Sequence, residues 1–340
     1  MSIRIPKGLP ALSALETEGV MVMDEENAVY QHHRPLRVGL LNLMPNKIST
    51  EIQIARLLGA TALQVELTLV KITNHAPKNT PIEHLDSFYQ DWSDIKEQKF
   101  DGFIVTGAPI ETIPFERVSY WEELTSIFRW TQTNVHSSFN ICWGAQAAMH
   151  YFHGMPKYTL DEKAFGVFRH HGLKTDSPYL KGFSDDFHIP VSRWTEMRRS
   201  DIPADSGLSV LIDSPDTGLC LLSDPKHHAL HFFNHIEYDS HTLADEYFRD
   251  REAGREISLP RNYFPDDCET RPPRNQWRSH AHLLFANWMT QISRTAPADP
   301  QRIGNDRVLP SAGEMRYAET HTPSSPQGAA VQRMEMASSS

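Results

Sequence analysis

Short apolar runs alternate with stretches of helical periodicity through the first half of the chain, and this alternation limits the fold more than any other feature. Runs rich in Val, Ile, Leu and Phe predict buried strands at 36–43, 65–70, 102–105 and 138–142. Between them, apolar side chains at near-helical spacing predict helices at 50–58, 84–95 and 120–131. Strands that alternate with helices predict a parallel sheet that is covered on both faces.

The second half of the chain is less regular. It contains strand-like runs at 208–212, 219–222 and 229–236 and a helical stretch at 280–292, whereas 158–199 fits neither pattern. The predicted fold class is therefore α/β, with a doubly wound and mainly parallel sheet flanked by helices.

One folded domain is expected over residues 1–295. The chain has 340 residues, of which 39% are hydrophobic, and this is enough to bury a substantial core. From 296 to 340 the composition shifts to Pro, Ser, Ala, Thr and charged residues, with few large apolar side chains to offset the entropy of ordering. We therefore expect 296–340 to be a disordered low-complexity tail.

Charge and cysteine content limit the partners and the compartment. The formal net charge of −10 and the lack of a long basic run argue against nucleic acid and favour a small-molecule substrate. Three widely spaced cysteines form a poor disulfide framework and indicate a reducing compartment. The sequence shows no apolar leader and no run of about 18 uncharged apolar residues that could cross a bilayer. We expect a cytoplasmic protein without a membrane partner.

Cys142 lies at the junction between a predicted strand and the helix that follows it. In doubly wound sheets, chemistry gathers where strands end and helices begin. A thiol on such a sharp turn projects above the sheet, and the helix N-terminus favours the thiolate, while Gly144 gives the turn room. Cys220 lies inside an apolar strand and is interpreted as a buried structural cysteine. Cys142 is the candidate nucleophile.

His235 and Glu237 provide a base and a carboxylate at the end of another apolar run. They are two residues apart, so on an extended backbone they point to the same face. Glu237 can hold one ring nitrogen of His235, which leaves the other free to take a proton from Cys142 or from an attacking hydroxyl. With 18 histidines in the chain, this pair alone carries little weight. Together with Cys142 it predicts a Cys-His-Glu triad.

A third element is the turn Thr106-Gly107-Ala108-Pro109, directly after a predicted strand. Backbone N–H groups of such a turn can stabilise a developing oxyanion, with the N–H of Trp143 as the second donor. The sequence leaves open whether Gly107 or Ala108 supplies the loop N–H, and we assign Ala108.

The order of these motifs resembles the class I glutamine amidotransferase-like fold. Those enzymes carry a Gly-x-Cys-x-Gly-x-Gln pattern, and this chain has Cys142-Trp143-Gly144-Ala145-Gln146 with Asn140 in place of the first glycine.

A closer resemblance is to the homoserine O-acyltransferase family of methionine biosynthesis, of the MetA type, over roughly residues 1 to 295. The matching segments are Ile3–Pro6, Leu41–Lys47, Asp101–Pro109, Ile141–Gln146, Phe165–Phe168 and Asn234–Tyr238. Segments of this length and specificity leave little room for coincidence.

The resemblance implies a role for each matching position. Cys142 would form an acyl-thioester, His235 would accept the proton and Glu237 would support it. Three further positions would bind substrate, and they are Lys163, Ser192 and Arg249. The family implies acyl-CoA as co-substrate, no cofactor, no metal and a homodimer.

Glu111 is the position that the resemblance links to the choice of acyl donor, since Glu is similar to the acetyl-CoA users and Gly to the succinyl-CoA users. A carboxylate at 111 would repel the terminal carboxylate of a succinyl group, whereas an acetyl group carries no charge. If Glu111 points to solvent, it does not decide the donor. The sequence predicts acetyl-CoA, with succinyl-CoA as the alternative.

Two other classes of function stay open at this level. A glutamine amidotransferase-like hydrolase would use Cys142 to release ammonia, but no synthase domain is visible. A non-catalytic metal-binding protein would use His227, His228 and His231 beside His235, although these spacings match no familiar zinc pattern.

Overall fold

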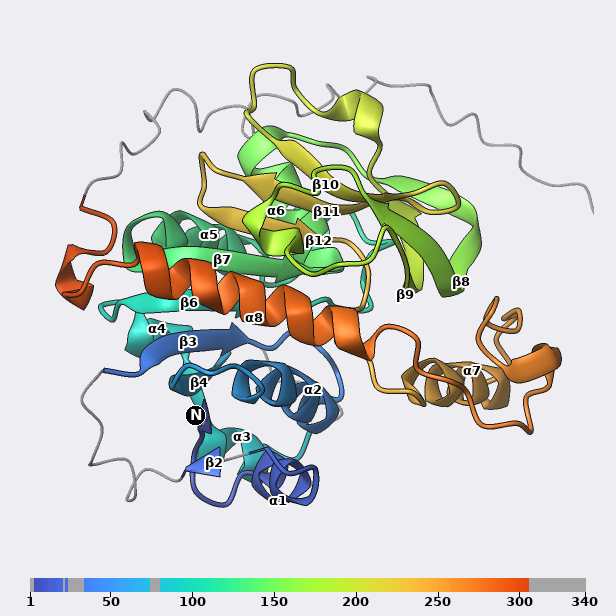
Figure 1. Ribbon diagram of the computed structural model, residues 1–340, viewed down its shortest axis with the longest axis horizontal. Coiled ribbons are helices and arrows are strands. Elements are labelled where there is room, and N and C mark those ends of the chain that lie inside the picture. Colours follow the sequence, from blue (N-terminus) through green and yellow to red (C-terminus); the bar gives the residue numbers. More distant parts are fainter. Residues whose placement is uncertain (1–2, 21, 24–33, 74–79, 306–340) are drawn as a thin grey trace, which may run out of the picture. The chain divides into compact units, whose positions relative to one another are not determined.

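The computed structural model describes residues 3–20, 22–23, 34–73 and 80–305. Within these ranges, twelve strands form one sheet in the order β2-β1-β4-β3-β6-β7-β12-β11-β10-β8-β9, with β5 beside β4 (Figure 1). The strands with parallel neighbours are β1 (Ile3–Arg4), β2 (Val22–Met23), β3 (Leu36–Leu41), β4 (Val65–Lys71), β5 (Tyr89–Asp91), β6 (Phe100–Val105), β7 (Val135–Ile141) and β12 (Ala229–Phe232). The remaining strands are antiparallel to their neighbours and are β8 (Tyr158–Gly172), β9 (Asp186–Glu196), β10 (Ser209–Ser214) and β11 (Gly218–Asp224).

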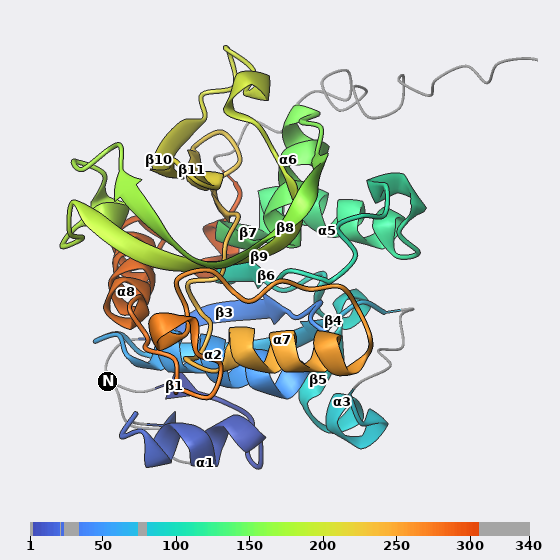
Figure 2. The same ribbon diagram turned by 90° about the vertical axis from the view of Figure 1, so that its right-hand side faces the viewer.

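Helices cover both faces of the parallel part of the sheet. Their bounds are α1 (Pro10–Thr17), α2 (Lys47–Gly59), α3 (Ile82–Phe88), α4 (Trp92–Ile95), α5 (Trp121–Asn134), α6 (Trp143–His153), α7 (Thr242–Glu252) and α8 (Arg278–Thr295). Apolar side chains of α2 and α8 share one core cluster with the sheet, and those of α5 and α6 share another. The ribbons of these two pairs of helices lie on opposite faces of the sheet (Figures 1 and 2). The predicted class, a mainly parallel α/β sheet flanked by helices, is confirmed.

Two predicted elements differ from the structure. The helix expected at 84–95 is broken into α3, β5 and α4, because Tyr89 pairs with Leu69 at the edge of the sheet and forces an extended backbone. The strand expected at 229–236 ends at Phe232, since the chain then turns and the N–H of His235 donates to the carbonyl of Pro190 at 3.0 Å.

Besides the N-terminal elements β1, α1 and β2, two other parts of the structure had no sequence-based prediction. The segment 158–199 contains the long antiparallel pair β8 and β9. Helix α7 was missed because its stretch is highly charged and contributes few buried apolar side chains, which are Leu243, Ala244 and Tyr247.

The domain boundary predicted at 296 falls inside packed structure. Ile303 is 1% exposed, and its carbonyl accepts a hydrogen bond from Lys99 Nζ at 3.1 Å. The guanidinium of Arg34 donates to the carbonyls of Pro297 and Ala298, each at 3.2 Å. Residues 296–305 therefore belong to the folded unit, and the rest of the predicted tail, from 306 onward, lies outside the described residues. None of the helices in the described ranges has the length and apolar content needed to span a membrane.

Strand order brings the predicted catalytic segments to one edge of the sheet. Neighbouring strands β6, β7 and β12 run parallel, so their carboxyl ends meet. Thr106 follows β6 and Cys142 follows β7, while His235 lies three residues beyond the end of β12.

Candidate active site

Cys142 occupies a strained turn between β7 and α6. Its backbone has φ 49° and ψ −117°, a conformation that side-chain-bearing residues rarely adopt. Its N–H donates to the carbonyl of Phe232 at 2.7 Å, which joins the turn to β12. Gly144 passes so close to the β6 loop that a Cβ there would lie 2.6 Å from the carbonyl oxygen of Thr106. The predicted nucleophile elbow is present, and it needs glycine at 144.

The contact expected between His235 and Glu237 is present, although both residues follow β12 and do not lie on an extended strand as the spacing argument assumed. Its Nδ1 lies 2.7 Å from Oε1 of Glu237, and both side chains are buried. The ring of Tyr238 stacks on the imidazole, with centroids 4.1 Å apart. The second oxygen of Glu237, Oε2, has no hydrogen-bond partner among the described residues. The carboxylate therefore serves this one imidazole and fixes its tautomer.

The thiol and the imidazole meet across the carboxyl edge of the sheet. Cys142 is a hydrogen-bond partner of His235. A Cβ built on Gly107 would lie 3.6 Å from Sγ of Cys142 and 3.7 Å from Cε1 of His235, so the loop backbone faces both groups. Burial lowers the pKa of His235, but the negative charges of Cys142 and Glu237 outweigh it and raise the pKa well above its usual value. The site therefore favours the protonated imidazole at His235.

The segments predicted to stabilise an oxyanion border the thiol. Trp143 is the first residue of α6, where backbone N–H groups have no partner within the helix. The β6 loop is fixed by Thr106, whose Oγ1 accepts from the N–H of Leu43 at 2.7 Å. Assigning Trp143 and Ala108 as the donors stays a prediction.

The three residues predicted to bind substrate come from three elements and converge on a fourth residue, Glu246. Lys163 of β8 places Nζ 2.5 Å from Oε1 of Glu246, and Oγ of Ser192 on β9 donates to the same oxygen at 2.8 Å. Nη2 of Arg249 is 4.0 Å from this oxygen and 2.8 Å from Oδ1 of Asp250. The sequence analysis missed Glu246 because it missed α7, although its position one helical turn before Arg249 was a usable signal.

Glu111 is held against β9 by the backbone. Its Oε1 accepts from the N–H of Trp194 at 3.0 Å, two residues after Ser192. Nearby, burial lowers the pKa of Lys157 to about 8, although Glu111 and Glu116 oppose the shift. Glu111 is thus a fixed negative charge beside the strand that carries Ser192.

Arg193 is a buried cation near the thiol that sequence reasoning did not identify. Its Nη1 donates to the carbonyl of Thr195 at 2.9 Å, and Nε to Oδ1 of Asn234 at 3.5 Å. Burial lowers the pKa of Arg193, and the charge of Cys142 is the largest influence in the opposite direction. The hydrogen-bond partners of the Arg193 guanidinium are neutral carbonyl and amide oxygens, so its positive charge is not neutralised by a directly bonded carboxylate. No sequence motif marks a buried arginine on a strand.

Sequence comparison identifies a family and close relatives of this chain. Residues 2–298 match the family model described as homoserine O-succinyltransferase. Homoserine O-acetyltransferases from Brucella canis (strain ATCC 23365) and Brucella abortus (strain S19) are each 63% identical over 304 residues, which is 89% of this chain and 99% of the relative.

Solved structures with a similar fold are much more distant in sequence. The protein SMU.1228c is 15% identical with a TM-score of 0.51, over 76% of this chain and 100% of that chain. A glutamine amidotransferase from Thermotoga maritima is 14% identical with a TM-score of 0.49, over 76% and 99%. At this level of identity the likeness concerns the fold alone.

Proposed function

The chain belongs to the homoserine O-acyltransferase family, and from this premise we propose that it transfers an acetyl group from acetyl-CoA to L-homoserine through a thioester on Cys142. The reaction is a step of methionine biosynthesis. The observation that carries the proposal is the contact between Cys142, on its strained elbow, and His235, which Glu237 orients.

The first half of the reaction forms the acyl-enzyme. The thiolate of Cys142 attacks the thioester carbonyl of acetyl-CoA, and the oxyanion receives hydrogen bonds from the N–H groups of Trp143 and Ala108. The new C–S bond to Cys142 forms as the bond to CoA breaks. The imidazolium of His235 gives its proton to the departing CoA thiolate, so His235 is neutral when the second half begins.

The second half returns the enzyme to its starting state. Neutral His235 takes the proton of the homoserine hydroxyl as the oxygen attacks the thioester on Cys142. The tetrahedral intermediate collapses, the C–S bond breaks, and O-acetylhomoserine leaves with Cys142 again a thiolate beside the imidazolium. Water competes with homoserine at this point, so a well-bound homoserine protects the acyl-enzyme.

Homoserine is a zwitterion, and the group around Glu246 offers charges of both signs. Lys163 and Arg249 are suited to the α-carboxylate, and Arg249 can hold it with two parallel hydrogen bonds. Glu246 is suited to the ammonium group, and Ser192 adds a hydroxyl. In this proposal homoserine replaces the contact between Lys163 and Glu246, which the structure has at 2.5 Å.

Acetyl-CoA is the proposed donor because Glu111 is a fixed charge. Its hydrogen bond from Trp194 holds the carboxylate on β9 near the substrate-binding group. A succinyl group would bring its own carboxylate toward this charge. The repulsion between two like charges 4 Å apart is on the order of 1 kcal/mol in water and 4 kcal/mol near a protein surface. An acetyl group carries no such cost.

The remaining expectations follow the same proposal. Acetyl-CoA acts as co-substrate, with no bound cofactor in the transfer itself. We place the enzyme in the cytoplasm, where Cys142 stays reduced, and expect a homodimer, which light scattering of the purified protein tests.

The direct test is to trap the acyl-enzyme. Incubation with acetyl-CoA in the absence of homoserine is expected to add one acetyl mass to the peptide that contains Cys142, and addition of homoserine should remove it. Label on another residue, or no label with acetyl-CoA and full label with succinyl-CoA, would contradict the proposal. Release of ammonia from glutamine would favour an amidotransferase-like hydrolase instead.

The donor assignment has its own matched pair of variants. Glu111→Gly is expected to raise the kcat/KM for succinyl-CoA relative to acetyl-CoA by about 10-fold or more, since one repulsive charge is removed. Glu116→Gln removes a charge that also acts on Lys157 but lies on an exposed side chain, 63% accessible, and should leave the ratio unchanged. An unchanged ratio in Glu111→Gly would assign donor choice to other residues.

A further inference from the structure

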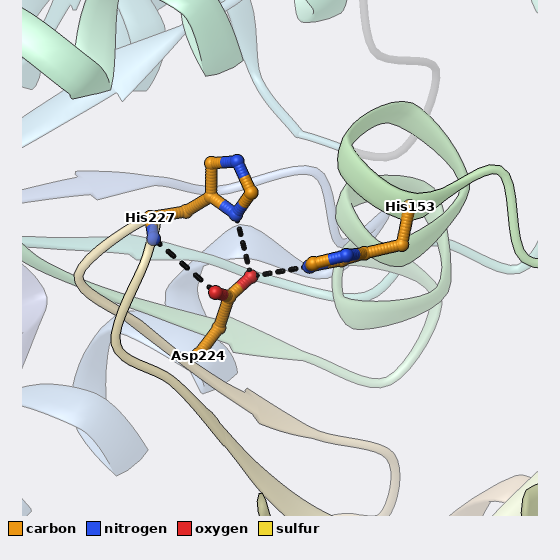
Figure 3. A group of neighbouring side chains, drawn as sticks. All are labelled: His153, Asp224 and His227. Atoms are coloured by element: carbon orange, nitrogen blue, oxygen red, sulfur yellow. Dashed lines mark hydrogen bonds and ion pairs between the residues drawn. The ribbon is translucent and has the colours of Figure 1, made fainter. Parts of the chain in front are cut away.

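A second buried cluster of histidines around a carboxylate lies at the other end of α6. His153 is the last residue of that helix, Asp224 ends β11, and His227 lies in the turn to β12 (Figure 3). Side-chain exposure is 5% for His153, 0% for Asp224 and 4% for His227. The proposed reaction uses none of these residues.

One oxygen of Asp224 is the centre of the cluster. Nε2 of His153 lies 2.6 Å from Oδ2, and Nδ1 of His227 lies 2.8 Å from the same atom (Figure 3). The other oxygen, Oδ1, accepts the backbone N–H of His227 at 3.2 Å and so fixes the turn. The three ligand atoms lie within 4.8 Å of one another, a spacing that a single metal ion could bridge after small shifts.

His231 directs a third nitrogen at the same oxygen. It lies on β12, its side chain is fully buried, and Nε2 is 3.5 Å from Oδ2 of Asp224. In the described structure this nitrogen makes no hydrogen bond. A buried polar atom without a partner costs about 1–3 kcal/mol. His153 and His227 contact Oδ2 at 2.6 and 2.8 Å, so the 3.5 Å contact of His231 is the longest of the three and leaves its nitrogen the least satisfied.

Asn140 offers the supporting contact that a histidine ligand needs. Its Nδ2 lies 3.3 Å from Nδ1 of His231, and its Oδ1 has no partner among the described residues. Rotation of the amide by half a turn lets Oδ1 accept a proton from Nδ1 of His231. That tautomer presents the lone pair of Nε2 to the centre of the cluster, as in metal sites where an acceptor orients the ligating histidine.

We propose that His153, Asp224, His227 and His231 form a buried site for one divalent transition-metal ion, with zinc as the best match. Three imidazoles and one carboxylate suit Zn²⁺ and its neighbours in the first transition row. Ca²⁺ and Mg²⁺ need about six oxygen ligands, which the cluster does not offer. Four ligands in a closed environment are typical of a structural site rather than a catalytic one. The sequence analysis expected no metal, and its metal-binding alternative included His227 and His231 but neither His153 nor Asp224.

Two further features favour a cation at this place. The cluster lies at the C-terminus of α6, where the helix dipole is negative. Phe152 stacks on the ring of His227 with centroids 4.2 Å apart, which keeps the ring in place and water away. Bound metal would join the end of α6 to the β11–β12 turn.

The test measures metal on the full chain, purified without a histidine tag and stripped with a chelator. One zinc per chain is expected by elemental analysis after exposure to a slight excess of Zn²⁺ and gel filtration. Saturation with zinc should raise the melting temperature by about 5 °C, as expected for a ligand at roughly 100 times its Kd. Co²⁺ should give the strong visible absorption of a four-coordinate site.

Variants separate this cluster from the triad, whose cysteine and histidine are also possible zinc ligands. Cys142→Ala should bind zinc like the wild type. His231→Gln removes a side chain without a hydrogen bond to Asp224 and should weaken zinc binding by at least about 100-fold while the protein stays folded. His150→Gln, on the same helix but bonded to Glu116, is the matched control and should not change binding.

Three outcomes would overturn the inference. The first is a wild type that retains no zinc and shows no shift in melting temperature. The second is loss of zinc in Cys142→Ala together with full retention in His231→Gln, which would assign the metal to the triad. The third is equal binding by His231→Gln, Asp224→Asn and the wild type.

Discussion

A buried histidine–carboxylate cluster lies at each end of helix α6. The two clusters contain similar residues, but we propose acyl transfer for one and metal binding for the other. At the N-terminus, Glu237 holds His235 beside Cys142. At the C-terminus, Asp224 lies between His153 and His227. The helix has eleven residues, so the two ends are separated by about 16 Å along its axis.

The two clusters differ in the groups that surround the carboxylate and its histidine. Glu237 binds one imidazole and leaves the opposite side of the ring to a thiol, so a proton can move between the ring and a reacting atom. Asp224 is surrounded by imidazoles, so no reacting atom has access. A histidine beside a carboxylate occurs at both ends of α6, so the feature that supports a catalytic role for the first cluster is the thiol in contact with the ring.

The comparison fails most clearly if the N-terminal cluster is not the reactive one. Cys142→Ala removes the atom that we propose carries the acyl group, and it is expected to lower kcat by at least about 10⁴-fold. The measurement is steady-state formation of O-acetylhomoserine, with circular dichroism to establish folding. Activity within tenfold of the wild type would mean that the acyl group never passes through residue 142.

Glu237→Gln tests whether the carboxylate acts on the imidazole, and a loss of about 10²–10⁴-fold in kcat is expected. Glu237 raises the pKa of His235, so its removal lowers that pKa. The imidazolium, which is lost as the pH rises through the folded pKa, is then lost at lower pH. The alkaline limb of the kcat/KM profile should move to lower pH, and alkylation of Cys142 by iodoacetamide at neutral pH should slow. An unchanged profile would make Glu237 a purely structural residue.

Glu246→Gln tests whether the residues around Glu246, on the side of the first cluster, bind homoserine. A hydrogen bond to a charged group contributes about 1.5–3 kcal/mol, so the KM for homoserine should rise by roughly 10–100-fold with a smaller change for acetyl-CoA. Glu252→Gln, at the exposed end of the same helix, is the control and should leave both values unchanged. An equal rise for the two substrates would contradict a role specific to homoserine.

Asp224→Asn should have the smallest effect on catalysis and a large one on stability. Sites more than about 10 Å apart couple by only a few tenths of a kcal/mol, so kcat/KM should change by less than about twofold. Loss of one partner from a buried charged cluster costs about 3–5 kcal/mol in the free energy of unfolding, which chemical denaturation measures. A large loss of kcat/KM with unchanged stability would remove the distinction between the two ends of α6.

The meeting of Cys142 and His235 could be predicted from the sequence because parallel strands bring their carboxyl ends to the same edge of the sheet. Once the chain is known to alternate strands and helices, the residues after β6, β7 and β12 must lie at one edge of the sheet. Cys142 and His235 therefore meet although they are 93 positions apart in the sequence. Their meeting depends on strand order, which the resemblance to a known fold supplied.

The second cluster and Glu246 could not be predicted in the same way. His153 and Asp224 are 71 residues apart and meet where the end of a helix packs on a hairpin turn, a contact that no periodicity encodes. Glu246 lies on α7, whose charged composition hides the helix. The pair β8 and β9 was missed because the first half of β8 has no buried residue and neither strand alternates regularly between buried and exposed positions.

The absence of a side chain at Gly144 has a consequence for how new specificities arise in such an enzyme. The first turn of α6 rests on the carbonyls of Val105 and Thr106, with no space for even a methyl group. Nucleophile turn and neighbouring loop are therefore inherited as a single rigid block, and a mutation that reshapes one displaces the other. On the proposed role of Glu111, selection for a different acyl group would act around Glu111 and β9, outside this block.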